Sequence, residues 1–256
     1  MNDFQDLHIL VTRPASQAQE LCDLISSRGG HPIHFPTIAF APPPDEALFY
    51  QSLMQLSEQD WLIFISPQAV SASISYIRKY WPHFPASVNI AAVGAGTAKA
   101  LLQAGFPHVL TPDKEWNSAG LLALSDFQQV SLKKIAIIRG AGGRELLDKT
   151  LRERGAQVLP VIAYQRILPD VDVSDCLKQL QEKTINRIIC TSFESVKNLK
   201  ILLGETGWPY LQNIPMIVMS ERIKTLAEDL GFRRLWVAHQ ASVNGILDTM
   251  AEIRNE

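Results

Sequence analysis

The chain has 256 residues, of which 46% are hydrophobic and 20% are charged, and a formal net charge of −2. This composition is typical of an ordinary globular protein and excludes a disordered or fibrous chain. The small negative charge argues against sequence-independent nucleic-acid binding, which needs a basic face to neutralise phosphates.

Three cysteines, Cys22, Cys176 and Cys190, form no CxxC pair and no metal-finger spacing. We therefore expect no disulfide framework and a reducing compartment. The first residues contain no apolar run of signal-peptide length, and no segment reaches the length of a membrane span. These features predict a cytoplasmic protein with no membrane partner.

Short β-rich runs alternate with amphipathic helical stretches along the chain. In the first half, the predicted strand and helix pairs are His8–Thr12 with Ser16–Ser27, Trp61–Ile65 with Pro67–Lys79, and Asn89–Val93 with Thr97–Ala104. In the second half they are Ile135–Ile138 with Arg144–Arg154, Arg187–Cys190 with Ser195–Leu203, and Met216–Val218 with Ile223–Leu230. Apolar strands that alternate with helices are typical of parallel sheets covered on both faces. We predict an α/β fold with two similar doubly wound parallel sheets.

The number of domains follows from a near-repeat at an offset of 126 residues. The recurring residues are Arg13 as Arg139, Arg28-Gly29 as Arg154-Gly155, Ser66 and Val70 as Ser192 and Val196, and Gly105-Phe106 as Gly231-Phe232. Residue types this uncommon, recurring in one order, indicate a duplicated α/β unit. Two similar domains imply a cleft.

Two proline-rich stretches, Pro36–Pro44 and Pro160–Pro169, interrupt the alternation. Proline fixes φ and biases the preceding residue to an extended conformation. These stretches therefore suit a two-stranded bridge with a hinge better than a helix. Two ordinary core strands that end in proline-rich turns are an equally good alternative.

Small, hydroxylated and arginine residues follow the predicted strands at their carboxyl ends. The loops are Thr12-Arg13-Pro14, Ser66-Pro67-Gln68, Gly94-Ala95-Gly96-Thr97, Arg139-Gly140-Ala141-Gly142-Gly143-Arg144, Thr191-Ser192-Phe193 and Ser220-Glu221-Arg222. Ligands of open α/β sheets bind at these strand ends, where helix N-termini and arginine forks bind anions. The pattern favours an anion-binding cleft. For any single serine, capping of its helix is the simpler alternative.

Sequence signatures of common cofactor and metal sites are missing. The pattern GxGxxG is interrupted by Lys99 after the first glycine pair and by Glu145 after the second, and GxxxxGK[ST] does not occur. The six histidines are scattered without HExxH, and His31 and His34 would face opposite sides of a strand. We expect neither a nucleotide cofactor nor a metal.

Tyr164 is the candidate for proton chemistry, because no Ser-His-Asp or Cys-His set is visible. It lies in the second proline-rich stretch, and the corresponding residue of the first stretch is Phe40. Both stretches therefore carry an aromatic ring at this position, but only Tyr164 carries a hydroxyl. An interdomain packing role for the ring is the alternative.

An ordered set of motifs resembles the bacterial form of the uroporphyrinogen-III synthase family. The motifs are VTRP (Val11–Pro14), ISPQAV (Ile65–Val70), AVGAGTAKAL (Ala92–Leu101) with a following Gly105-Phe106, RGAGGREL (Arg139–Leu146), RGAQVLPVIAYQR (Arg154–Arg166) and TSFESVKNL (Thr191–Leu199). They occur in the family's order over nearly the whole chain. Any single motif would be weak evidence for the family, whereas the ordered set is specific to it.

The resemblance implies two flavodoxin-like α/β domains with the active site in the cleft between them. Domain 1 would comprise residues 1–37 and 167–256, and domain 2 residues 40–164, with linker strands near 36–40 and 160–167. A division of the chain at the repeat boundary near residue 127 would then be wrong.

The reaction implied is cyclisation of the linear tetrapyrrole hydroxymethylbilane with inversion of ring D, which releases water and gives uroporphyrinogen III for haem and sirohaem biosynthesis. Loss of the terminal hydroxyl would give an azafulvene. Attack by ring D would then give a spiro intermediate, and rearrangement of this intermediate would give the inverted ring. The family works without a cofactor. A monomer in transient contact with the preceding pathway enzyme is expected.

Residue by residue, Tyr164 matches the family's bridge tyrosine, which is proposed to help the hydroxyl leave. Thr97, Ser66 and Ser192 match hydroxyl residues that bind substrate carboxylates. We add Arg13, Arg139 and Arg144 as counter-charges. Some members carry a Thr-Thr pair where this chain has Arg222-Ile223, so Ser220 and Arg222 are expected to serve there instead.

Two other functions fit parts of the pattern. A two-lobed cytoplasmic protein that binds or senses a small anion would have the same cleft and hinge. A two-domain sugar-nucleotide transferase fits less well, since no nucleotide signature is present. Product analysis with hydroxymethylbilane distinguishes these functions from the synthase.

Overall fold

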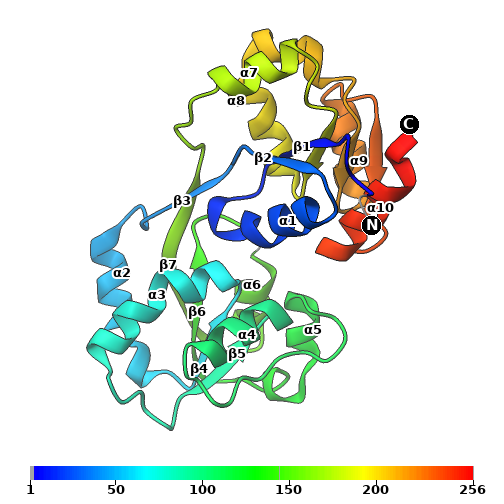
Figure 1. The fold of residues 1–256 in the computed structure, drawn as a ribbon. Helices are drawn as coiled ribbons and strands as arrows, with labels where there is room; N and C mark the ends of the chain where they lie inside the picture. The colour runs from blue at the N-terminus through cyan, green and yellow to red at the C-terminus, as the bar shows by residue number, and fades with distance from the viewer. Residues whose placement is uncertain (1–2, 144, 256) are drawn as a thin grey trace. The chain divides into compact units, whose positions relative to one another are not determined.

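The computed structural model describes residues 3–143 and 145–255 (Figure 1). The chain forms two compact units. Unit 1 combines the segment that ends at Ala39 with the segment that begins at Ile167, and unit 2 is Phe40–Arg166. Unit 1 is therefore discontinuous in the sequence, and unit 2 is inserted into it.

Unit 1 contains a five-stranded sheet in the order β10-β9-β8-β1-β2, counted over the described residues. Its elements are β1 (His8–Val11), α1 (Ala15–Ser27), β2 (His31–His34), α7 (Ser174–Gln181), β8 (Arg187–Cys190), α8 (Phe193–Leu211), β9 (Met216–Val218), α9 (Glu221–Asp229), β10 (Leu235–Val237), α10 (Val243–Glu252) and the 3-10 turn η3 (Ile253–Asn255). All of its strand pairs are parallel. If its five strands are numbered 1 to 5 along the chain and read from the β2 edge, their order is 2-1-3-4-5, which is that of flavodoxin-like sheets.

Unit 2 contains the second five-stranded sheet of the described chain, in the order β3-β7-β6-β4-β5. Its elements are β3 (Ala39–Ala41), α2 (Glu46–Leu53), η1 (Leu56–Glu58), β4 (Trp61–Phe64), α3 (Pro67–Tyr80), β5 (Asn89–Ala92), α4 (Ala95–Gln103), α5 (Ser118–Ala123), η2 (Ser125–Phe127), β6 (Lys134–Gly140), α6 (Leu146–Glu153) and β7 (Gln157–Ile167). The pairs among β4, β5, β6 and β7 are parallel.

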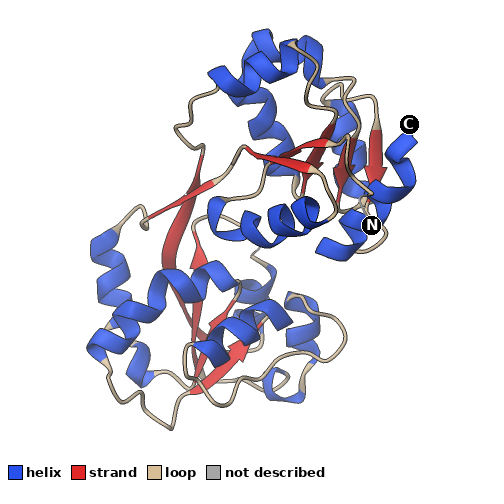
Figure 2. Cartoon of the chain, viewed as in Figure 1, coloured by secondary structure: helices blue, strands red, loops and turns tan. Residues whose placement is uncertain are grey.

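Both faces of each sheet are covered by helices (Figure 2), and alternate strand residues enter different cores. In β8, Ile188 and Cys190 pack with α7, α8 and α9, whereas Ile189 packs with α1 and α10. In β4, Phe64 packs with α3 and α4, whereas Ile63 packs with α5 and α6. This two-sided burial explains the uniformly apolar strands. The predicted doubly wound parallel fold is confirmed.

The repeat has a structural counterpart in the two sheets. The offset of 126 places β1 on β6, β8 on β4 and β9 on β5, so that β2-β1-β8-β9 corresponds to β7-β6-β4-β5. Gly29 and Gly155 have φ of 85° and 84°, and Gly105 and Gly231 have φ of 86° and 98°. These left-handed residues lie just after α1, α6, α4 and α9, where glycine ends a helix without strain.

The two proline-rich stretches differ in how much strand they contain. The first contributes only the three-residue strand β3, whereas the second lies in β7, an 11-residue strand. Pro160 is paired in the sheet opposite Ile137. The second stretch is therefore a core strand of unit 2 as well as a connector.

The helix predicted at Ser195–Leu203 continues to Leu211 in the structure. Gly204 interrupts it with φ 53° and ψ −159°, and a second helical stretch follows that contains Pro209. Most other predicted strands and helices agree with the structure to within two residues.

Of the helices in residues 3–143 and 145–255, none combines the length and apolar character needed to cross a membrane. The same part of the chain contains no group of three or more His, Cys, Asp or Glu residues placed to hold a metal ion.

Candidate functional site

The candidate residues follow strands at the point where the order of each sheet reverses. In unit 1 this point lies between β1 and β8, and in unit 2 between β4 and β6. Ligands of open parallel sheets bind beyond the carboxyl ends of such strands. Arg13 and Ser192 follow β1 and β8, whereas Ser66 follows β4 and Arg139 is near the end of β6.

Tyr164 and Ser66 lie together in unit 2, although 98 residues separate them in sequence. The Ser66 Oγ and the Tyr164 hydroxyl are 3.2 Å apart. Ser66 Oγ also accepts the Ala69 N–H at 3.1 Å, as the N-cap of α3. The Tyr164 side chain is buried, with 3% of its surface exposed, and its ring meets Phe40 edge-on at 5.4 Å between centroids.

Gly140 forms the wall against which the Tyr164 ring packs. A Cβ atom at position 140 would lie 2.6 Å from Tyr164 Cζ and 3.0 Å from its hydroxyl oxygen. The register of β6 and β7 shifts here, so that Arg139 pairs with Ile162 and Gly140 with Tyr164. Irregularities of this kind re-aim a side chain. Local backbone geometry and the missing Cβ thus define the position of the phenol.

Arg139, expected as a counter-charge, folds back on its own loop. Its Nη2 donates to the carbonyl of Gly142 and its Nε to the carbonyl of Gly140 at 3.4 Å. Gly142 and Gly143 adopt left-handed φ of 71° and 97°. The guanidinium therefore braces the loop that follows β6. Arg144, the other expected counter-charge of this loop, lies outside the described residues.

Thr97 lies in the first turn of α4, next to β5, and only 3% of its surface is exposed. Its N–H donates to the carbonyl of Gly94 at 3.0 Å. Gly94, not a hydroxyl residue, caps this helix. Ala95 and Gly96, which begin this helix, are more exposed than Thr97, so their backbone N–H groups are the more accessible donors of this loop.

Arg13 in unit 1 is half-buried at the end of β1. Desolvation by burial lowers the pKa of its guanidinium from the ordinary value, and attraction to Glu20 opposes this shift. Among the described residues, no side-chain hydrogen bond or ion pair of Arg13 is found; only its carbonyl is engaged, at 2.9 Å from His34 Nε2. A half-buried guanidinium whose N–H groups form no hydrogen bond or ion pair among the described residues is suited to bind an anion.

Ser192 and Ser220 are the N-caps of α8 and α9. Ser192 Oγ accepts the Ser195 N–H at 3.1 Å, and Ser220 Oγ accepts the Ile223 N–H at 3.3 Å. Ser242, which the sequence did not single out, caps α10 in the same way. Capping and ligand binding are compatible, because a capping hydroxyl keeps its own proton for donation. Arg222 is exposed in the first turn of α9.

Sequence reasoning missed a buried network of three hydroxyls in unit 1. Ser195 Oγ lies 2.6 Å from Thr12 Oγ1 and 2.7 Å from Thr37 Oγ1, and all three residues are at most 2% exposed. Thr12 Oγ1 also donates to the Ile189 carbonyl at 2.8 Å. The network ties the loop that carries Arg13 to the start of α8. The sequence showed hydroxyl residues after the strands, but it did not show that hydroxyls more than 150 residues apart are hydrogen-bonded to each other.

The chain is similar to known uroporphyrinogen-III synthases over nearly its whole length. Residues 19–248 match the family described as uroporphyrinogen-III synthase HemD. The uroporphyrinogen-III synthase of Escherichia coli K12 is 32% identical over 94% of this chain and 98% of its own, and that of Salmonella typhimurium LT2 is 30% identical over the same shares.

Solved structures of similar fold include two described as uroporphyrinogen III synthases. A mutant from the extremely thermophilic bacterium Thermus thermophilus superposes with a TM-score of 0.63 at 18% identity, covering 98% of this chain and all of that chain. The Helicobacter pylori structure gives a TM-score of 0.64 at 17% identity, covering 97% of this chain and all of that chain. At these identities the two structures support the fold.

Proposed function

The chain belongs to the uroporphyrinogen-III synthase HemD family, and from this membership we infer that it has uroporphyrinogen-III synthase activity in tetrapyrrole biosynthesis. The reaction is that of a hydro-lyase. The proposed substrate is hydroxymethylbilane, which the protein closes with inversion of ring D. It acts as a cytoplasmic monomer that receives the substrate in transient contact with the preceding enzyme.

Tyr164 assists departure of the terminal hydroxyl. The observation that carries this assignment is the pair of hydroxyls at 3.2 Å, which Tyr164 and Ser66 form at the carboxyl ends of β7 and β4. A phenol hydroxyl can donate a proton to the leaving hydroxyl, which departs as water. Ser66 holds the phenol oxygen while its own cap bond fixes the serine.

The carboxylates of the substrate bind at the carboxyl-end edges of the two sheets. Arg13 is the principal cation in this proposal, because it is half-buried and its side chain forms no hydrogen bond or ion pair with the described residues. The Ser192 and Ser220 hydroxyls and the first-turn N–H groups of α8 and α9 add donors, as Thr97 and its helix α4 do in unit 2. Arg222 contributes charge from the surface.

Arg139 acts indirectly in this proposal. Because its guanidinium is engaged by the carbonyls of Gly140 and Gly142, it shapes the loop beside Tyr164. Arg144 remains a proposed counter-charge. The main task of the site is to hold the two ends of the linear substrate in one geometry and to exclude water, since closure without inversion proceeds unaided.

The deciding experiment supplies purified protein with freshly generated hydroxymethylbilane, then oxidises the products and separates uroporphyrin I from uroporphyrin III. A dominant III isomer above the spontaneous background is expected. Formation of the I isomer alone by folded protein would contradict the synthase activity and favour a protein that only binds small anions.

Tyr164→Phe tests the residue assignment in the same assay. Loss of one positioned proton donor should lower turnover by about 10–100-fold with little change in stability. Tyr80→Phe, at a tyrosine that is 38% exposed on α3, is the matched control and should keep full activity. Unchanged turnover of Tyr164→Phe would reduce this tyrosine to a packing role.

A further inference from the structure

A large pocket lies in unit 2 at the opposite end of the strands from the proposed reaction site. Its volume is about 1020 Å³. Trp61 and Asn89, the first residues of β4 and β5, line it, whereas Ser66 and Thr97 follow the carboxyl ends of the same strands. The chemistry proposed for the synthase therefore leaves this pocket unused, although its volume is that of a small-molecule site.

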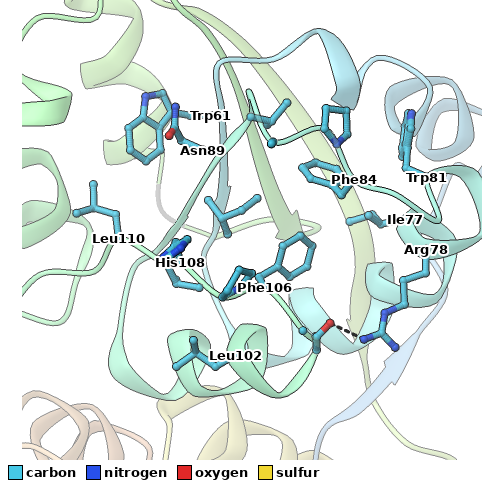
Figure 3. Close-up of a pocket in the computed structure, with 18 of the residues that line it drawn as sticks. Trp61, Ile77, Arg78, Trp81, Phe84, Asn89, Leu102, Phe106, His108 and Leu110 are labelled. Carbon is cyan, nitrogen blue, oxygen red and sulfur yellow. Dashed lines mark hydrogen bonds between the residues drawn. The ribbon is translucent and has the colours of Figure 1, made fainter.

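Aromatic rings form one wall of the pocket (Figure 3). Phe84 meets Trp81 edge-on at 6.4 Å and Phe106 edge-on at 5.6 Å between ring centroids. Leu102 of α4, with 53% of its surface exposed, adds an aliphatic side chain. Such a wall is suited to an apolar, ring-containing ligand.

The backbone around the pocket is stiffened by prolines. Pro82 and Pro85 flank Phe84, and Pro107 follows Phe106; all three line the pocket. Proline fixes φ, so these segments have fewer backbone conformations. A site built from such segments loses less entropy when a ligand binds.

The ionisable side chains that line the pocket are basic. Arg78 and His108 are exposed there, and no Asp or Glu is among the described lining residues. Arg78 Nη2 donates to the carbonyl of Ala104, which anchors the guanidinium at the mouth and leaves its other N–H groups for a ligand. The carboxylate of Asp60, next to Trp61 in sequence, is held by Lys133 Nζ at 3.0 Å and by the Lys134 N–H at 2.8 Å.

We propose that this pocket is a second ligand site, which binds a small aromatic molecule that carries an acidic group. The rings of Trp81, Phe84 and Phe106 contact the apolar part, and Arg78 binds the anion. The site is separate from the proposed reaction and does not depend on it.

The test uses two fluorescent probes that share their rings and differ in charge. 1-Anilinonaphthalene-8-sulfonate carries a sulfonate, and N-phenyl-1-naphthylamine does not. The full chain should bind the sulfonate probe saturably at one site in this pocket, with higher affinity than the uncharged probe. Leu102→Glu should weaken binding of the sulfonate probe by at least about tenfold, and Arg78→Gln should weaken the same probe by about tenfold without affecting the uncharged one.

Ile201→Glu is the matched control, because Ile201 of α8 is 52% exposed and lies in unit 1. It should bind both probes like the unmodified protein, and the Leu102 and Arg78 variants should keep synthase turnover. No saturable binding, or equal binding by the Leu102→Glu and Ile201→Glu proteins, would overturn the site. Equal affinity for the two probes, unchanged by Arg78→Gln, would overturn the acidic ligand class.

Discussion

Gly140→Ala should inactivate the enzyme by moving the Tyr164 phenol. The added Cβ would lie 2.6 Å from Tyr164 Cζ and 2.7 Å from Cε2, whereas carbon atoms in contact are about 3.5–4.0 Å apart. Gly140 is not among the residues with positive φ, so alanine fits the backbone and only the contact is violated. The ring must therefore move by about 1 Å.

For a proton donor, the role proposed for Tyr164, a displacement of this size costs about 100-fold in rate, equivalent to about 2.7 kcal/mol of transition-state stabilisation. Initial rates of uroporphyrin III formation would measure the loss. The ring strain should also lower the free energy of unfolding by about 1–3 kcal/mol, which urea denaturation would measure.

Gly207→Ala is a control with the same steric overlap in the other unit. Its Cβ would lie 2.6 Å from Leu203 Cβ in unit 1, so it should lower stability without a selective loss of turnover. If Gly140→Ala acts through the phenol, it should also add little to the loss in a Tyr164→Phe protein. A folded Gly140→Ala enzyme with turnover within about twofold of the parent would refute this reasoning.

Three further predictions concern other parts of the chain. Arg13→Ala should raise KM by about tenfold or more, because a charge-assisted bond contributes about 1.5–3 kcal/mol; normal kinetics with a lowered Tm would instead mean that Arg13 braces its loop. Ser195→Ala should destabilise the fold by about 1–3 kcal/mol in urea denaturation, since it removes the hydrogen bonds that the buried hydroxyls of Thr12 and Thr37 form with Ser195 Oγ; exposed Ser27→Ala, which should change little, is its control. Burial raises the pKa of Cys190 from 9.0 to about 11. Between pH 9 and 11 this thiol is therefore ionised in the unfolded chain but still protonated in the folded one, and the free energy of unfolding should fall over this range. Cys190→Ala should show a shallower fall over that range, and an identical pH profile would contradict the attribution to Cys190.

Much of the fold could be predicted because its causes are local. Apolar runs such as Arg187–Cys190 and Met216–Val218 were placed at their observed bounds, since strands buried on both faces are continuously apolar. The repeat at an offset of 126 residues also identified the equivalent strands of the two sheets. The strand β3 was harder: its three residues are only half-buried and are followed directly by three prolines, so it lacks the signal of a strand buried on both faces.

The candidate site was predicted only as a set of residue types after strand ends. The motifs identified the family resemblance, with which the comparisons agree, and they singled out Tyr164 and Ser66 separately. The contact between these two hydroxyls was not visible, and neither was the folding back of Arg139 onto its own loop. Such contacts depend on strand register and side-chain direction.

The sequence by itself thus determined the alternating strand and helix pairs and their duplication, because helix caps, apolar periods and proline constraints act over a few residues. Its ordered motifs carried the family resemblance. Only the tertiary structure decided that Thr12, Thr37 and Ser195 share hydrogen bonds, that Gly140 makes room for the Tyr164 ring, and that a basic aromatic pocket forms at the amino ends of β4 and β5. The physical reason is that these contacts join atoms from distant parts of the chain, and their distances are fixed by sheet order, register and close packing of the core.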